Sequence, residues 1–215
     1  MKQSEDNVLK VKADDKNCTY EEKKENVKKL AGAISHFLRE QDVIYIRAVG
    51  DECIEKTTKA LCIAKQNIKE DNLSLAYTPF LIDVDMGDNL SVGGISFKVT
   101  SFDRVPEEDD IDWEVYQGKV FKVSADARDC SRDEKTEARR KLASAIMHTI
   151  EQEGELALKC LKRSAVVKGV RSVIQAQSIA AMHGKEIEMW SDYLVVQNDE
   201  KYLTGVVFYI YERQQ

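Results

Sequence analysis

Basic side chains are concentrated in one stretch of this 215-residue chain. Residues 156–185 contain no aspartate or glutamate but six basic residues: Lys159, Lys162, Arg163, Lys168, Arg171 and Lys185. Lysine and arginine at this density favour contact with phosphates, as along the backbone of a nucleic acid. The alternative interpretation is that these charges only solvate one face of a helix.

Residue types that carry catalysis are few and scattered. His36 and His148 could act as a general base or a metal ligand, but we favour helix-face histidines without chemistry. Cys18 and Cys130 precede predicted helix starts, where a thiolate can be stabilised, but small packing residues are the simpler interpretation. The chain has no GxxxxGK[ST], GxGxxG or GxSxG motif. We therefore expect no catalytic residue, no metal, no cofactor and no enzyme activity.

An internal repeat places the basic stretch in the second of two copies. With a shift of 112 positions, residues 8–36 match residues 120–148 at 15 of 29 positions without a gap. This predicts a tail (1–7), an acidic domain (8–103), an acidic linker (104–118) and a more basic domain (119–215). Trp113 is a candidate anchor for the linker.

Each copy shows the same order of elements, β-α-β-α-β-β. Thr19 with Glu22, and Ser131 with Glu134, predict capping boxes at the start of the first helix. Ser164 is expected to cap the second helix of copy two, and Gly184 to end it. The predicted strands are 8–13, 43–49, 73–77 and 95–102, then 120–125, 156–161, 187–190 and 206–211. The fold class is α/β (α+β), with both helices on one face of a mixed sheet.

These segments resemble the stage V sporulation protein S family, a branch of the Alba-like superfamily of nucleic-acid-binding proteins. Copy one carries the resemblance in LKVKA (9–13), KLAGAI (29–34), IYIRAVG (44–50) and TKALCIAK (58–65). Copy two carries it in FKVSAD (121–126) and KLASAI (141–146), while LKRSAVVKGVRSV (161–173) is more similar to the basic strand-to-helix segment of Alba proteins. The resemblance implies two tandem Alba-like domains that bind DNA or RNA without catalysis and form an intrachain pseudo-dimer.

In Alba proteins the contacts come from the loop after the first strand, the start of the second helix, and the hairpin. Together with the basic stretch, the resemblance implies these nucleic-acid-binding residues in copy two: Arg128, Arg132, Lys159, Lys162, Arg163, Lys168 and Arg171. Lys12 and Lys16 are weaker candidates in copy one. The hairpins depart from the pattern, because they carry Asp83, Asp85 and Asp88, and Asp199 and Glu200 beside Lys201. We expect no phosphate contact from such acidic hairpins.

The net charge of −6 hides an asymmetry. Residues 1–112 hold 16 Lys+Arg and 23 Asp+Glu, whereas residues 113–215 hold 16 and 15. Copy two is therefore expected to carry any binding to nucleic acid. Tyr45, Tyr77, Phe208, Tyr209 and Tyr211 lie on predicted strands, where they can stack on bases or pack in a core or interface; we favour packing.

Two functions compete. The first is a non-catalytic nucleic-acid-binding protein that uses mainly the second domain. The second is an accessory subunit of a larger nucleic-acid-modifying complex, such as a methyltransferase assembly, in which the acidic copy binds a protein partner. The five cysteines form no CxxC pair, and no apolar stretch is long enough for a signal or a membrane span. We expect a cytoplasmic or nuclear protein without a membrane or small-molecule partner.

Overall fold

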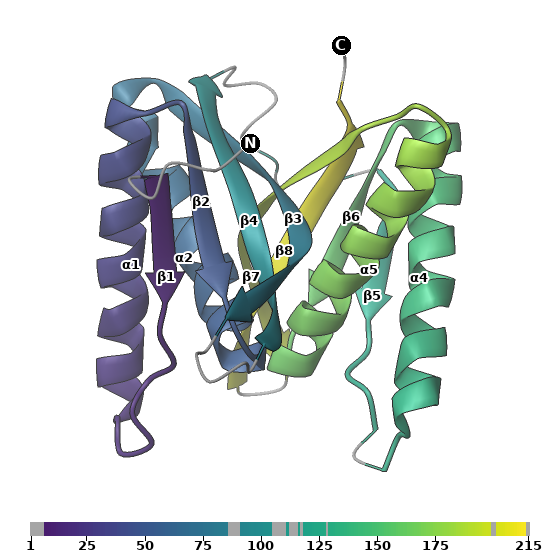
Figure 1. Ribbon diagram of the computed structural model, residues 1–215, viewed down its shortest axis with the longest axis horizontal. Coiled ribbons are helices and arrows are strands. Elements are labelled where there is room, and N and C mark those ends of the chain that lie inside the picture. The colour runs from purple at the N-terminus through teal and green to yellow at the C-terminus, as the bar shows by residue number, and fades with distance from the viewer. Residues whose placement is uncertain are drawn as a thin grey trace. The chain divides into compact units, whose positions relative to one another are not determined.

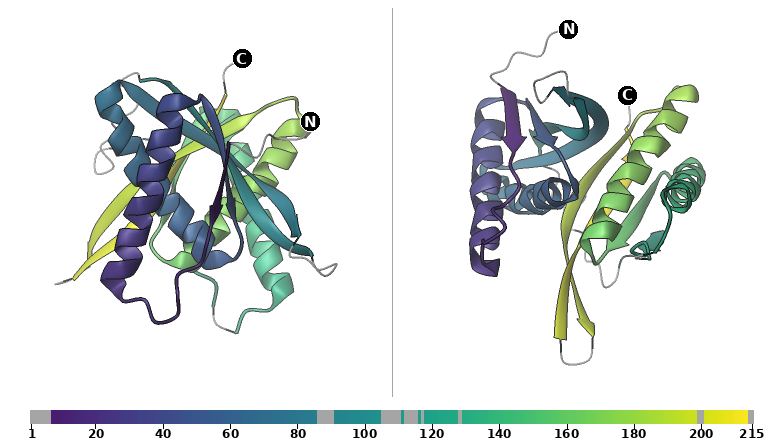
Figure 2. Two further views of the ribbon diagram at one scale, coloured as in Figure 1. Left: turned by 60° about the vertical axis from the view of Figure 1, so that its left-hand side comes forward. Right: turned by 60° about the horizontal axis from the view of Figure 1, so that its bottom comes forward.

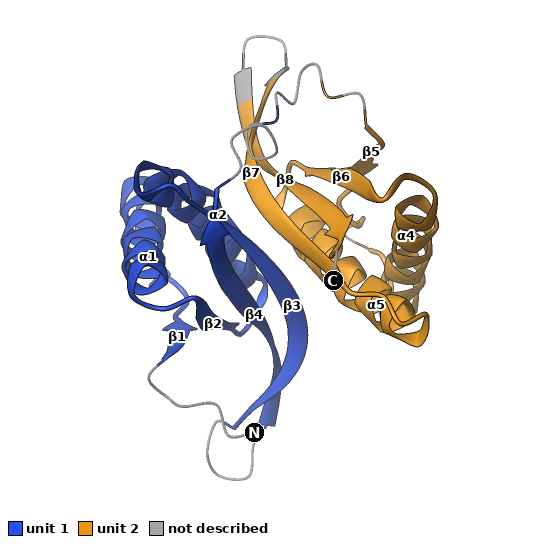
Figure 3. Cartoon of the chain, turned by 90° about the horizontal axis from the view of Figure 1, so that it is seen from above, with its two compact units in different colours: residues 1–111 blue, residues 112–215 orange. Residues whose placement is uncertain are grey.

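The computed structural model describes residues 7–85, 91–104, 111, 116, 118–127, 129–198 and 201–213. The chain forms two compact units, residues 1–111 and 112–215 (Figure 3). The division between them falls within the range predicted as the linker, of which Trp113 lies outside the described residues. The pseudo-dimer stays a prediction.

The described part of unit 1 forms two α-helices and a four-stranded mixed sheet (Figure 1). Its strands run in the order β1-β2-β4-β3, in which β1 and β2 are parallel and the other neighbours antiparallel. A short 3-10 turn, Lys69–Asp71, follows the second helix. The elements are β1 (Val8–Val11), α1 (Tyr20–Glu40), β2 (Val43–Ala48), α2 (Asp51–Ile68), β3 (Leu73–Asp85) and β4 (Ser91–Asp103).

Unit 2 repeats this topology. Its strands run in the order β5-β6-β8-β7, with β5 parallel to β6 and the remaining pairs antiparallel. The predicted order β-α-β-α-β-β is thus confirmed in both copies, although the first strands are shorter and the hairpin strands longer than expected. The elements are β5 (Val120–Val123), α4 (Arg132–Glu153), β6 (Glu155–Cys160), α5 (Arg163–Met182), β7 (Ile187–Asn198) and β8 (Lys201–Glu212).

The core of each unit lies between its two helices and one face of its sheet (Figure 2). Along β2, Ile44, Ile46 and Ala48 are buried, whereas the residues that alternate with them are half-buried. This is the pattern of a strand packed on helices from one side. The same layer in unit 2 includes Phe208, which reaches Gly169 of α5. Completely buried aliphatic and aromatic side chains of this kind stabilise a fold by about 1.5–3 kcal/mol each.

Three of the four helix ends predicted from the sequence have the expected capping residues, and the start of α5 is the exception. Both predicted capping boxes form, at Thr19 with Glu22 and at Ser131 with Glu134. Gly184 has a φ of 69° directly after α5, a left-handed conformation that suits glycine at a helix end. None of the helices in the described part of the chain has the length and apolar character needed to cross a membrane.

Candidate nucleic-acid interface

The ends of β5 and β6 and the starts of α4 and α5 lie at the same end of unit 2. Because β5 and β6 are parallel and each leads into a helix, α4 and α5 both begin where these strands end (Figure 1). The first N–H groups of a helix have no partner within the helix, and the helix dipole adds partial positive charge there. We call this end of the unit the basic end. The start of α5 is electrically suited to bind anions there, whereas the first turn of α4 already carries Asp133 and Glu134.

Lys162 and Arg163 add full charges to the start of α5. Lys162 occupies the N-cap position without a side-chain cap hydrogen bond, Arg163 is the first helical residue, and both are exposed. The expectation that Ser164 caps this helix is wrong, because the helix begins before it and Ser164 lies within the first turn. The first turn contains no acidic residue. Cations at a helix start are unfavourable for the helix itself, and a bound phosphate would offset that cost.

Unit 1 has the opposite charge at the equivalent place. Gly50, with a φ of 85°, takes the N-cap position of α2, and Asp51 and Glu52 lie in the first turn. These carboxylates already interact favourably with the helix dipole, and they repel phosphate. The two copies therefore share the order of elements but differ at this helix start, both in the backbone conformation of the N-cap residue and in the charge of the first turn.

Lys168 is held by an acidic partner inside unit 2. Its Nζ lies 2.9 Å from Asp126 Oδ1 and 3.4 Å from the Ser124 carbonyl oxygen, and its side chain is only 14% exposed. Unit 1 contains the same contact, in which Lys56 Nζ binds Asp14 Oδ1 and donates to the Lys12 carbonyl at 3.0 Å. We therefore regard Lys168 as a residue that positions the loop after β5, and we leave it out of the interface proposed below.

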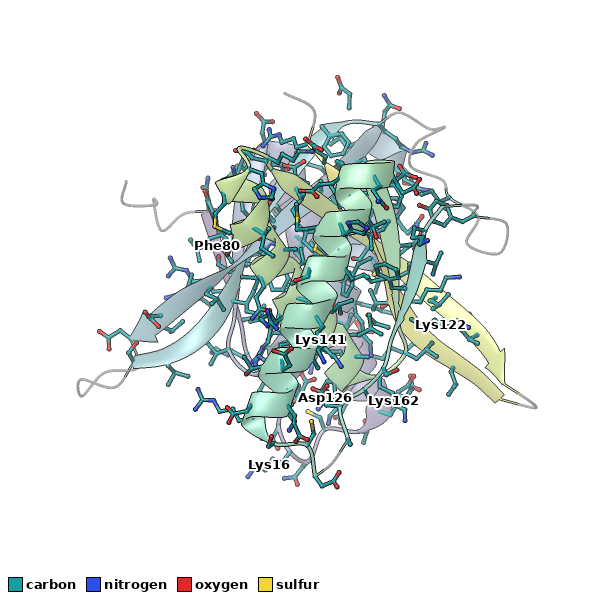
Figure 4. All side chains as sticks on the ribbon, turned by 90° about the vertical axis from the view of Figure 1, so that its right-hand side faces the viewer. Lys16, Phe80, Lys122, Asp126, Lys141 and Lys162 are labelled. Atoms are coloured by element: carbon teal, nitrogen blue, oxygen red, sulfur yellow. The ribbon has the colours of Figure 1, made fainter. Side chains whose placement is uncertain are left out.

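The other predicted residues are distributed over three places. Arg132 is exposed at the first position of α4, next to the basic end, whereas Arg128 lies outside the described residues. Arg171 is half-buried about 12 Å further along α5, given a rise of 1.5 Å per residue. Lys159 pairs in register with Lys122 of β5 on the sheet face away from the helices. Figure 4 shows Asp126 and Lys162 near the start of α4, with Lys141 farther along that helix.

The weaker candidates belong to unit 1. Lys12 and Lys16 are both exposed in the loop between β1 and α1. A shallow hollow beside this loop is lined by Lys10, Lys12, Asp14, Asn26 and Lys56, among others. On the hairpin of this unit, Asp83 and Asp85 are exposed on β3, while Asp88, Asp199 and Glu200 lie outside the described residues.

Two tyrosines and one glutamate form a cluster that the sequence did not indicate. Tyr209 of β8 donates to Glu155 Oε2, and Tyr116 donates to Glu155 Oε1 at 3.1 Å. Burial raises the pKa of Tyr209 and of Tyr116, and Glu155 raises both further. Tyr116 comes from the range predicted as the acidic linker, so part of that range packs within unit 2. The Trp190 and Tyr209 rings, 5.0 Å apart, extend the cluster.

Within each unit, the histidine and the cysteine singled out in the sequence lie apart from each other in the structure. Among the described residues there is no group of three or more His, Cys, Asp or Glu side chains placed to hold a metal ion. His36 lies 3.6 Å from Glu40 on the same helix, and His148 is exposed on α4. Cys18 and Cys130 are half-buried, and burial together with nearby carboxylates raises the pKa of the Cys130 thiol. That direction opposes formation of a reactive thiolate.

Fold and charge together define a chain of two small β-α-β-α-β-β domains whose second copy has a basic end. The family model for stage V sporulation protein S (SpoVS) matches residues 22–101 and again residues 134–213. These ranges cover well over half of the chain, so the chain belongs to the SpoVS family and contains two tandem copies. None of the curated proteins compared with the chain matches it.

Proposed function

We propose that this protein binds nucleic acid without catalysis, through the basic end of unit 2. The observation that carries the proposal is the start of α5, where Lys162 and Arg163 are exposed beside the first N–H groups of the helix and no acidic residue shares the first turn. Arg132 adds a third exposed cation at the start of α4, where it shares the first turn with Asp133 and Glu134. A nucleic-acid backbone offers the closely spaced phosphates that such an arrangement can bind.

The experiment is a fluorescence anisotropy titration of the full chain with labelled duplex DNA and duplex RNA at several salt concentrations. In the Lys162→Gln/Arg163→Gln variant we expect weaker binding and, on B-DNA, a salt slope shallower by about 2, since each lost phosphate contact contributes about 0.9. The charge-matched control is Arg140→Gln/Lys141→Gln, whose side chains are exposed in the middle of α4. Equal slopes for both double variants would contradict the proposal.

A second candidate function rests on the acidic start of α2 and on the exposed Asp83 and Asp85 of β3. These carboxylates suit a basic protein partner, so unit 1 would attach the chain to a larger nucleic-acid-modifying assembly. Native purification with and without nuclease separates the two functions. A stoichiometric partner that survives nuclease, and is lost in Asp51→Lys/Glu52→Lys but not in Asp133→Lys, would support attachment through this end. A partner lost on nuclease treatment would support binding to nucleic acid alone.

A further inference from the structure

The sheet of unit 1 has one face turned away from α1 and α2, and this face is basic although the unit as a whole is acidic. The strand register places Lys10 opposite Arg47, and Tyr45 opposite Lys98. Phe80 of β3 lies opposite Ser96, which in turn lies opposite Arg47. We call the surface formed by Lys10, Tyr45, Arg47, Phe80 and Lys98 the basic sheet face. Phe80 is labelled in Figure 4.

Among the residues of β1 to β4, no carboxylate lies on this face. Every residue of β1 to β4 is described, so the alternation of side chains assigns each one to a face. The acidic strand residues Asp83, Asp85 and Asp103 all fall on the alternate positions. These four strands therefore contribute three cations and no carboxylate to the basic sheet face. Lys10 is exposed, and the other four side chains are half-buried.

Two of the cations are direct neighbours. Lys10 and Arg47 stand opposite each other on parallel strands, and like charges in that position destabilise a sheet. Unit 2 repeats the arrangement with Lys122 opposite Lys159. Lys122 is labelled on its strand in Figure 4. A polyanion bound across the strands would attract both cations and offset the repulsion between them.

Aromatic rings accompany the cations. The Tyr45 and Phe80 ring centroids are 6.4 Å apart, with the ring planes at 84°. Both rings are half-buried on this face, and base–aromatic stacking is the usual platform for single strands. Tyr77, by contrast, is buried against Phe97 on the helix side, with centroids 5.9 Å apart. The sequence could not separate Tyr45 from Tyr77, whereas the register does.

We propose that the basic sheet face binds single-stranded nucleic acid, with phosphates on Lys10, Arg47 and Lys98 and bases on Tyr45 and Phe80. A duplex keeps its bases inside the helix, so it can use the cations but not the rings. This inference shares the ligand class of the proposed function but rests on a different unit and on different residues. The two can therefore fail separately.

The test compares the full-length protein with its Tyr45→Ala variant in anisotropy titrations on a labelled oligothymidylate and on duplex DNA. We expect the affinity for the single strand to fall by about 5- to 150-fold, the range for one stacked base, and the affinity for duplex to stay the same. Tyr45→Phe keeps the ring and should restore binding. Tyr20→Ala removes a tyrosine that is 78% exposed at the start of α1 and serves as the matched control.

The charges are tested with Lys98→Gln, which should make the salt slope on the single strand shallower by about 0.7. The inference is wrong if Tyr45→Ala binds the single strand as the wild type does, or loses single strand and duplex equally. If Lys162→Gln/Arg163→Gln has no effect while Tyr45→Ala loses the single strand, the proposed function at the basic end fails and the basic sheet face stands. If instead Tyr45→Ala has no effect while Lys162→Gln/Arg163→Gln weakens binding, the inference on the basic sheet face fails and the proposed function at the basic end stands.

Discussion

Lys168 Nζ lies 2.9 Å from Asp126 Oδ1, which joins the loop after β5 to the second turn of α5. The side chains of the pair are 14% and 15% exposed, so the charges attract each other with little screening by water. Lys56 and Asp14 make the same connection in unit 1, exactly one repeat earlier in the chain. In both copies a lysine thus fixes the loop that leads to the first helix.

Removal of one partner should therefore destabilise the domain. We expect Lys168→Met to lower the free energy of unfolding by about 1–3 kcal/mol, because Asp126 keeps its charge without its main counterion. Urea unfolding measures the loss, and hydrogen exchange should locate it in the loop after β5 and in α5. The salt slope of nucleic-acid binding should not change, since Lys168 is not counted among the phosphate contacts. A shallower slope with unchanged stability would return Lys168 to the interface.

The pair in unit 1 has an additional contact. Asn26 Nδ2 donates to Asp14 Oδ1 at 2.9 Å, whereas the equivalent residue in unit 2 is Ala138. Burial alone would raise the pKa of Asp14, but the hydrogen bonds from Lys56 and Asn26 outweigh it and lower the pKa below its usual 3.8. We expect Asp14→Asn to cost more stability than Asp126→Asn, as measured by hydrogen exchange in the two units. Equal costs would show that the Asn26 contact contributes nothing.

The capping boxes should make stability depend on pH. Hydrogen bonds from the backbone and side chain of Thr19 lower the pKa of Glu22, and those from Ser131 lower the pKa of Glu134. A lowered folded-state pKa means that this stabilisation is present above the unfolded-state value of 4.5 and is lost as the pH falls through the folded-state value. The stability difference between wild type and Glu134→Gln should therefore shrink in unfolding experiments run from neutral to acidic pH. A stability difference that stays constant with pH would contradict the prediction.

The N-cap hydroxyls give a second measure of the same motif. Thr19→Ala and Ser131→Ala should each cost about 1 kcal/mol, because each leaves a backbone N–H at the helix start without its acceptor. Thr19→Ser keeps the hydroxyl and is the control. Urea unfolding of the three variants checks the prediction, and a Thr19→Ala variant as stable as Thr19→Ser would refute it.

The structural features that could be predicted from the sequence are those that neighbouring residues in the chain determine. The capping boxes and Gly184 were predictable because helix-end chemistry acts over a few residues. The repeat also predicted the order of elements, since both copies carry the same pattern. The partner of Lys168 was not predictable, because Asp126 is 42 residues away and only the packing of α5 beside β5 brings them together. The face occupied by Tyr45 was equally hidden, since it depends on strand register.

Tyr116 and Tyr209 should lose their phenol protons at a higher pH than an unperturbed tyrosine does. Burial and the neighbouring Glu155 raise the pKa of both phenols above the usual 10, so folding favours their protonated form. Their stabilisation is present below pH 10 and is lost as the pH rises, because the unfolded chain releases these protons first. Tyrosinate absorbance should show late-titrating groups that disappear in Tyr116→Phe/Tyr209→Phe. Tyr20→Phe, which changes an exposed tyrosine, should leave them in place, and their persistence in the double variant would assign them elsewhere.

Gly205 permits a close approach that the start of α5 requires. A Cβ at this position of β8 would clash with the Cys160 carbonyl oxygen and lie 2.9 Å from Leu161 Cα, both backbone atoms of the connection that leads to Lys162. We expect Gly205→Ala to cost about 1–3 kcal/mol, and to weaken nucleic-acid binding because the connection carrying Lys162 must shift. Gly94→Ala, whose Cβ would meet the Ala48 carbonyl oxygen at 3.2 Å, should cost less, and Gly93→Ala, with no atom within 4 Å, should cost nothing. Urea unfolding and anisotropy titration of the three variants test this order, and a Gly205→Ala protein with the stability and affinity of Gly93→Ala would overturn it.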